Sequence, residues 1–154
     1  MIVLYVIGAL IAAGAIHMIV QNNRIPRNIG GQDGQLSPMP ASPNAVASYA
    51  QSEDKKVDPL PLFESAPRTL DLLKQILSEH GAEIISSDER YIHAVYTTPG
   101  MKFKDDVEFL ILEDKNIVDF RSASRVGQSD MGVNRKRYAR IRSRYLELSG
   151  NQQQ

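Results

Sequence analysis

The sequence contains no cysteine and no tryptophan among its 154 residues. Without cysteine the chain can form no disulfide, no thiolate metal site and no cysteine nucleophile, although this absence fits either side of a membrane. Its 18 basic and 18 acidic residues give a formal net charge of zero. Overall neutrality and the scarcity of aromatic residues argue against a nucleic-acid partner.

Recognisable catalytic motifs are also missing. The sequence has no P-loop, no dinucleotide-binding fingerprint and no serine-nucleophile elbow. Its three histidines, His17, His80 and His93, do not have the spacing of metal ligands. We therefore expect no metal and no cofactor. Because His93 falls in a predicted strand, we expect it to be packed or exposed rather than catalytic.

The first long segment is apolar. Residues 2–20 contain no Asp, Glu, Lys or Arg, and at about 1.5 Å per residue they span about 28 Å, close to the roughly 30 Å hydrocarbon core of a bilayer. No basic residue precedes this run, which is longer than the core of a signal peptide. We predict an uncleaved single-pass transmembrane anchor over residues 1–21, so that the membrane is a partner through residues 2–20. A cleaved signal and a buried core helix are the alternatives.

Residues 22–64 are rich in proline and glycine, which break every candidate helix. This composition is typical of an extended tether. The tether is either a flexible linker or a segment partly packed on the domain, and pure linkers contain fewer apolar residues. We favour partial packing and expect Leu36 or Val46 to be buried.

Residues 65–150 have the pattern of a compact domain. Ser65 suits the N-cap of a helix that has Pro67 in its first turn and Gly81 just past its end. Apolar residues recur along this helix at helical spacing, which predicts one buried face: Leu70, Leu73, Ile76 and Leu77. Four strands separated by turn-forming residues follow, over residues 82–86, 91–97, 106–112 and 117–124.

The last two of these strands are joined by a four-residue hairpin loop, residues 113–116. Pairing across this loop places Phe109 opposite Phe120 on an apolar face and Glu108 opposite Arg121 on the other. A shift of one residue would send both phenylalanines to the wrong side of the sheet. We therefore predict that Glu108 and Arg121 are cross-strand neighbours.

A final helix is predicted from a cap at Asn134 to the neighbourhood of Gly150, with residues 151–154 as a disordered tail. Its apolar stripe consists of Tyr138, Ile141, Tyr145 and Leu148. The fold class that follows is α+β, with a small antiparallel sheet of about four strands and two helices packed on one face.

Positive charge is concentrated between the last strand and the last helix. Residues 121–144 hold eight Lys or Arg against one acid, Asp130. Three of the cations, at 135–137, fall in the first turn of the helix, where the macrodipole is itself positive. Free backbone N–H groups and arginines together suit an anion. The candidate ligand-binding residues are Arg121, Ser122, Ser124, Arg125, Ser129, Asp130, Asn134, Arg135 and Arg137.

Three arrangements can accommodate this charge: internal ion pairs, a bound external anion, or a solvated basic face. Residues 105–119 contain six carboxylates and one lysine. Internal pairing with Asp105, Asp106, Glu108 or Asp130 is therefore the arrangement we favour.

Three segments of the chain resemble the bacterial and plastid family called domain of unknown function 1499. They are LSPMPASPNAVAS (36–48), DDVEF (105–109) and RSASRVGQSDMGVNRKR (121–137). The similarity covers about residues 28–146. Members of the family typically carry two cysteines at the positions of Met39 and Ala45, so any role of that pair cannot operate here. The resemblance implies a membrane-attached or exported domain and supplies no established activity.

The side of the membrane is indicated by two opposing signals. Arg24 and Arg27 follow the apolar run, which by the positive-inside rule favours a cytoplasmic domain. The family resemblance favours the periplasmic side, and we expect a single-pass inner-membrane protein with its domain there. Nothing in the sequence indicates an oligomeric state.

Two classes of function stay open. The first is a non-catalytic envelope module that binds an anionic group or a partner protein through residues 121–137, with the arginines directed toward one concave point. The second is a hydrolase or transferase that uses Asp106 or Glu108 beside those arginines. A carboxylate locked to an arginine favours the binding module, whereas one that faces an open pocket favours the enzyme. We favour the binding module.

Overall fold

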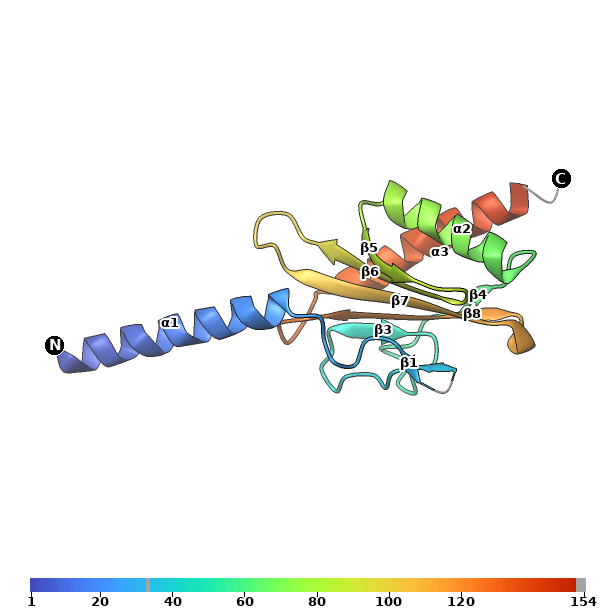
Figure 1. Cartoon of the computed structure of the whole chain (residues 1–154). Coiled ribbons are helices and arrows are strands. Elements are labelled where there is room, and N and C mark those ends of the chain that lie inside the picture. Colours follow the sequence, from blue (N-terminus) through green and yellow to red (C-terminus); the bar gives the residue numbers. More distant parts are fainter. Residues whose placement is uncertain (33, 152–154) are drawn as a thin grey trace.

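The computed structural model describes residues 1–32 and 34–151. One long helix, α1 (Ile2–Asn23), projects from an α+β body (Figure 1). The remaining elements are β1 (Gly31–Gln32), β2 (Gln35–Leu36), β3 (Ala45–Ala47), β4 (Leu60–Pro61), α2 (Ala66–Glu79), β5 (Glu83–Ser87), β6 (Tyr91–Thr97), β7 (Lys104–Leu112), η1 (Glu113–Lys115), β8 (Ile117–Ser124) and α3 (Val133–Asn151).

The main sheet is antiparallel, in the order β3-β8-β7-β6-β5, and β4 also pairs with β8. The α+β fold is confirmed, and β5 to β8 are the four predicted strands. The sheet gains two further strands, β3 and β4, from the segment predicted as a tether. Each pairs with β8 over only two or three residues, and such short edge pairings leave little signal in the sequence.

The predicted pairing of β7 with β8 is confirmed. Glu108 lies opposite Arg121, and Phe109 lies opposite Phe120. Asn116, in the left-handed conformation with φ 57°, ends the short turn η1 and allows the chain to reverse. The tight turn and the alternation of apolar and polar residues therefore select one register.

The core lies between the sheet and the two helices α2 and α3, which cover the same face (Figure 1). Phe120 is central to it: its ring lies 4.0 Å from that of Tyr138 and 5.1 Å from that of Phe109, centroid to centroid. The predicted apolar stripes of both helices are buried, except that Leu148 is only partly covered. Ser65 caps α2 as predicted, because its side chain accepts a hydrogen bond from the Arg68 N–H.

The start of α3 differs from the prediction. The helix begins at Val133, and Asn134 is not its cap. The carboxylate of Asp130 instead accepts hydrogen bonds from the N–H groups of Gly132 and Asn134, at 3.1 and 2.8 Å. The negative charge of Asp130 is better suited to this end of the helix, and the Asn134 side chain is free to enter the protein interior. The helix includes Asn151, and residues 152–154 of the predicted tail lie outside the described residues.

The N-terminal segment folds back over the sheet face that the helices leave open (Figure 1). Leu36 and Val46, the residues expected to be buried, are 6% and 5% exposed. Ala47 donates a hydrogen bond to the Lys55 carbonyl at 2.9 Å. The Lys55 ammonium in turn donates to the carbonyls of residues 40, 41 and 42. These contacts make the segment part of the folded domain.

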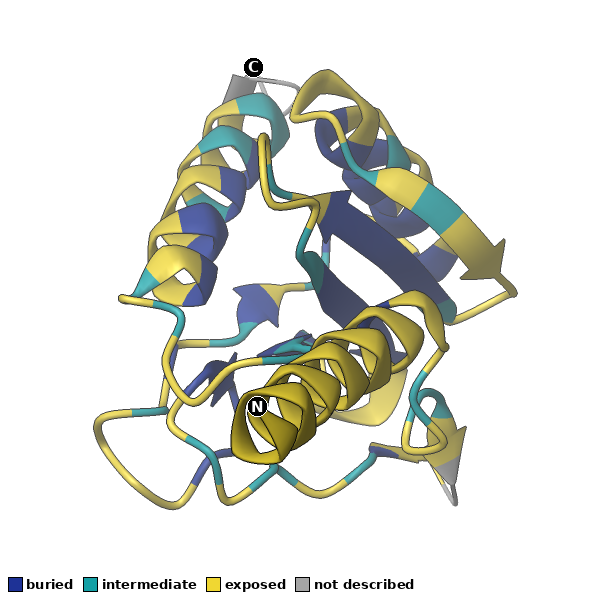
Figure 2. Ribbon diagram, turned by 90° about the vertical axis from the view of Figure 1, so that its left-hand side faces the viewer, coloured by how far each residue is buried: buried dark blue, intermediate teal, exposed yellow. Residues whose placement is uncertain are grey.

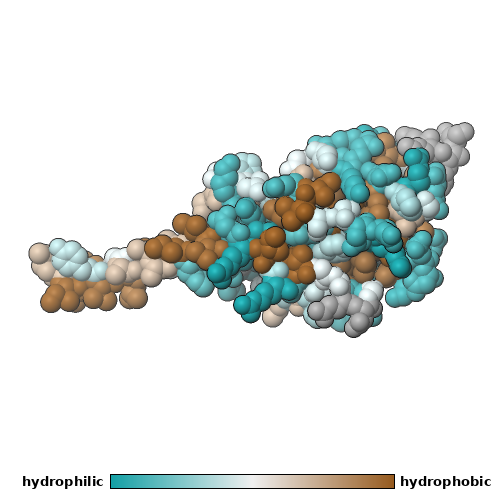
Figure 3. Space-filling model, viewed as in Figure 1, coloured by the Kyte–Doolittle hydropathy of each residue, from teal (hydrophilic) through white to brown (hydrophobic). Residues whose placement is uncertain are grey.

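Helix α1 is exposed along nearly its whole length, as Figure 2 shows from its N-terminal end. It is long and apolar enough to cross a membrane, and none of its most apolar 18-residue window is buried. The buried core helix considered above is therefore excluded, and α1 fits a single-pass anchor or a signal sequence. Figure 3 shows it as a largely apolar rod attached to a mostly hydrophilic body.

Candidate functional site

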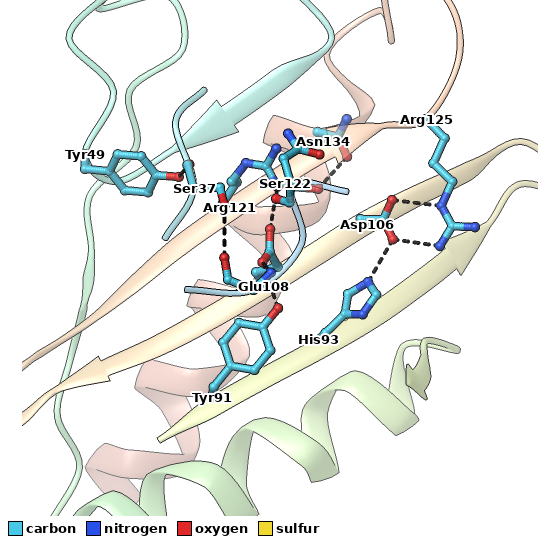
Figure 4. A network of polar contacts seen from close by, with 12 residues as sticks. Ser37, Tyr49, Tyr91, His93, Asp106, Glu108, Arg121, Ser122, Arg125 and Asn134 are labelled. Atoms are coloured by element: carbon cyan, nitrogen blue, oxygen red, sulfur yellow. Dashed lines mark hydrogen bonds and ion pairs between the residues drawn. The ribbon is translucent and has the colours of Figure 1, made fainter. Parts of the chain in front are cut away.

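The first polar cluster of the sheet surrounds Glu108, on the face opposite the helices (Figure 4). The Glu108 carboxylate pairs with the guanidinium of Arg121 and accepts hydrogen bonds from the Tyr91 hydroxyl at 2.7 Å and the Gly30 N–H at 2.8 Å. Arg121 also donates to the Asn28 carbonyl. Glu108 is 0% exposed and Arg121 is 2% exposed, so the N-terminal segment seals this ion pair from water.

A second cluster lies on the same face, around Asp106. Arg125 donates two hydrogen bonds to its carboxylate, both at 2.8 Å, and the Nε2 atom of His93 lies 2.8 Å from the same group. Burial opposes ionisation of Asp106. The hydrogen bonds from Arg125 and His93 together outweigh burial and hold the Asp106 pKa below its usual range. Asp106 is therefore a charged partner of Arg125 at neutral pH.

A third cluster lies on the helix side of the sheet and connects β7, β8 and α3. Arg137 donates to the Asp105 carboxylate at 2.6 Å and also to the Asn134 amide oxygen. Ser124 donates to Asp105 and Ser122 donates to Asn134, at 2.5 and 2.6 Å. The Asn134 side chain is 0% exposed, so this cluster joins the start of α3 to the sheet from within.

The structure therefore divides the predicted site between the two faces of the sheet. Arg121 and Arg125 lie on the covered face, whereas Ser122, Ser124, Asn134 and Arg137 lie on the helix side. Ser129 accepts a hydrogen bond from the Met131 N–H and belongs to the loop before α3, as does the cap residue Asp130. Arg135 is exposed and donates to the Asp54 carbonyl at 2.7 Å. Arg125 therefore has different partners from Arg135 and Arg137 and is not directed toward one concave point with either of them.

The buried arginines of residues 121–137, here called the arginine motif, form ion pairs inside the protein. Arg121, Arg125 and Arg137 are each at most 9% exposed, and each is paired with a carboxylate of β7. Removing one partner of such a pair leaves an uncompensated charge, which is strongly destabilising. The arginine motif is thus a structural feature that fixes β7, β8 and α3 to one another.

Four residues absent from the prediction complete these surroundings. Tyr91 and His93 both point into the covered face of β6, and Asn22 accepts a hydrogen bond from Arg125 through its carbonyl oxygen. Tyr96 lies on the other face, where the Arg137 guanidinium stacks over its ring at 4.5 Å from the centroid. The pairing of β6 with β7 is the signal that would have grouped His93 with Asp106 and Tyr91 with Glu108.

Two pockets open near the clusters. One, of about 490 Å³, lies beside β8 and the segment after α1, and its lining includes Arg121 and Arg125, whose charges are already matched. The other, of about 410 Å³, is here called the Tyr96 pocket. Its lining includes His80, Tyr96, Thr98, Val133, Arg137 and Arg140, and no described residue that lines it is a carboxylate.

The Tyr96 hydroxyl is unusual in its surroundings. It is buried, and within residues 1–32 and 34–151 it has no hydrogen-bond partner. Burial raises the Tyr96 pKa, against the effect of the nearby Arg137 and Arg140, so the hydroxyl keeps its proton at neutral pH and can donate it. Arg140 is exposed and forms no ion pair with a described residue.

Within residues 1–32 and 34–151, no group of three or more His, Asp or Glu side chains could hold a metal ion. Asp106 and Glu108 are both held by an arginine and by further donors.

A comparison with curated proteins finds no match to the chain. A comparison with protein families matches one family model over residues 35–145. This range includes every strand of the main sheet and most of α3. The chain therefore belongs to the family described as protein of unknown function, DUF1499.

Proposed function

We propose that this chain is a membrane-anchored, non-catalytic module of the cell envelope that binds an anionic group in the Tyr96 pocket. The observation that carries the proposal is the buried Tyr96 hydroxyl, which has no partner among the described residues and lies beside two arginines. A buried hydroxyl without a partner costs about 1–3 kcal/mol. An anion oxygen within reach would satisfy it.

The charge of the pocket supports the same conclusion. Arg140 has no ion pair within the described chain, and its positive charge adds to that of Arg137, which is shared with Asp105. Val133, the first residue of the 19-residue helix α3, also lines the pocket, and the N-terminal end of a helix favours negative charge. Of the arginines predicted from the sequence to bind the anion, only Arg137 belongs to the proposed site. The second arginine of the site is Arg140.

The enzymatic alternative receives less support. Asp106 and Glu108 are the carboxylates that a hydrolase or transferase would use, and both are at most 1% exposed. Each is held by an arginine and by a second donor from β6. A general acid or base needs to reach a substrate proton, and these carboxylates are closed off from solvent.

Binding of an anion should be visible as stabilisation. At ten times its dissociation constant, a bound ligand adds about 1.4 kcal/mol to the free energy of unfolding, which raises Tm by several degrees. We expect the full chain in detergent micelles to have a higher Tm in phosphate than in chloride at equal ionic strength. Tyr96→Phe and Arg140→Gln should each reduce this difference.

Phosphate also stabilises folded proteins in a non-specific way, so the control variant decides the interpretation. Arg90→Gln removes an exposed arginine from the opposite end of β6 and should leave the difference between the two salts unchanged. The proposal is wrong if phosphate and chloride give the same Tm, or if all three variants respond as the unmodified chain does.

The proposal also places the domain on the periplasmic side of the inner membrane, with α1 as its uncleaved anchor. Protease added to intact spheroplasts should then digest the domain, whereas a cytoplasmic control protein should survive until the membrane is permeabilised. Protection of the domain in intact spheroplasts would put it in the cytoplasm, as the positions of Arg24 and Arg27 suggest.

A further inference from the structure

The end of α1 is fixed to the domain without a spacer. The Asn22 side chain donates to the Lys102 carbonyl at 2.8 Å and accepts from the Lys104 N–H at 2.9 Å. Arg125 donates to the Asn22 carbonyl at 3.2 Å. Asn22 is 7% exposed, although the residues on both sides of it are exposed. These three contacts form a clamp that sets the position of α1 relative to the sheet.

Two loops lie at the end of the domain from which α1 leaves (Figure 1). One is the turn between β6 and β7, residues 98–103, and the other is the loop from β8 to α3, residues 125–132. Each presents an exposed methionine: Met101 is 71% exposed and Met131 is 87% exposed. Ile25, which follows the clamp, is 55% exposed. Apolar side chains are therefore directed into solvent on three neighbouring segments.

Local backbone conformation does not account for these methionines. Met131 has φ 52° and Lys102 has φ 56°, a left-handed conformation that glycine or asparagine adopts at lower cost. Neither turn needs a long apolar side chain for its own geometry, and neither methionine packs into the core. An amphipathic environment next to the loops would explain their presence.

Basic residues outnumber acidic ones beside these methionines: the one acid next to them, Asp130, is engaged by the N–H groups of Gly132 and Asn134. Arg24, Arg27 and Lys102 are exposed and form no ion pair with a described residue. Basic residues beside exposed apolar ones are typical of surfaces that contact anionic lipid headgroups.

We infer that the proximal surface, formed by Ile25, Met101, Lys102 and Met131 around the end of α1, docks on the lipid headgroup layer of the membrane that α1 spans. This inference rests on α1 as an uncleaved anchor. The 22 residues of α1 cover about 33 Å at roughly 1.5 Å per residue, which matches the hydrocarbon core. The clamp at Asn22 then holds both loops at the level of the headgroups. The Tyr96 pocket, lined by Thr98 and Val133 beside the same loops, opens near this layer.

The absence of tryptophan from the sequence makes site-specific fluorescence a direct test. The full chain carrying Met101→Trp or Met131→Trp is reconstituted into vesicles of phosphatidylethanolamine and phosphatidylglycerol, with and without lipids brominated near the top of their acyl chains. We expect bromine to quench both tryptophans several-fold and their emission to lie at shorter wavelength than that of an exposed tryptophan.

Two further variants separate the inference from the proposed anchor. Ile11→Trp, in the middle of α1, should be quenched strongly by lipids brominated near the ends of their acyl chains if the anchor is inserted. Lys115→Trp lies in the turn between β7 and β8, at the opposite end of the sheet, and should not be quenched. Quenching at residue 11 without quenching at residues 101 and 131 would overturn the docking surface and leave the anchor standing. No quenching at residue 11 would overturn both, and equal quenching at residue 115 would overturn the proposed orientation.

Discussion

Replacing Glu108 with glutamine should lower the free energy of unfolding by about 3–5 kcal/mol, the cost of breaking a buried ion pair by removing one partner. Arg121 would keep its charge, at 2% exposure, with no carboxylate to match it. Glutamine has nearly the same shape and can still accept a hydrogen bond from Tyr91 or Gly30. The loss would therefore reflect charge rather than packing.

The measurement is urea unfolding of the full chain in detergent micelles, followed by the near-ultraviolet circular dichroism of its tyrosines. Glu79→Gln is the matched control, because Glu79 pairs with Arg144 at the surface, at 3.3 Å, and exposed pairs contribute little. Its unfolding midpoint should not change. The double variant Glu108→Leu, Arg121→Met removes both charges and should recover part of the loss, because Tyr91 and Gly30 still lose their acceptor. A Glu108→Gln variant as stable as the unmodified chain would contradict a structural role for the pair.

Replacing Asp106 with asparagine should have a comparable effect that depends on pH. The Asp106 pKa in the folded protein lies below its usual range, because the hydrogen bonds from Arg125 and His93 outweigh the effect of burial. An unfolded Asp titrates near about 3.9. The contribution of its charge to stability is therefore fully present above that value, and it is lost as the pH falls through the lower pKa of the folded state.

The difference in stability between the unmodified chain and Asp106→Asn should accordingly be large at neutral pH. It should shrink as the pH is lowered below about 4, because Asp106 then binds a proton as well. Unfolding midpoints measured between neutral and acidic pH test this directly. Asp114→Asn, in the exposed turn η1, should give a midpoint close to that of the unmodified chain throughout. A constant difference for Asp106→Asn across the whole range would mean that its charge does not contribute.

The paired strands β7 and β8 could be predicted from the sequence because two independent signals agreed. The short turn and the positions of Phe109 and Phe120 require the same register, and that register brought Glu108 to Arg121. The same reasoning stopped at β6, since the loop before β7 contains Pro99 and Gly100 and its length does not fix a register. His93 was therefore not connected to Asp106.

Other features depend on tertiary contacts that local patterns do not report. Pro61 ends the two-residue strand β4, and proline is compatible with a strand only where its missing N–H is not needed, as at an edge. Asn134 has the local character of a cap, yet its buried contacts with Ser122 and Arg137 determine where it lies. The side of the sheet that Arg125 and Arg137 occupy follows from where β8 ends and α3 begins, and element boundaries are the least predictable feature of a sequence.

Asn22 leaves the ribosome early, but the residues that hold it are 80 to 103 positions further along the chain. As the proposed anchor, helix α1 would enter the membrane during synthesis while no part of its clamp exists. The segment after it likewise has no surface on which to lie until β7 and β8 have been synthesised. Contacts of such high sequence separation form slowly. Synthesis that stopped before Arg125 would leave the proposed anchor attached to an unfolded chain, which is a substrate for quality-control proteases.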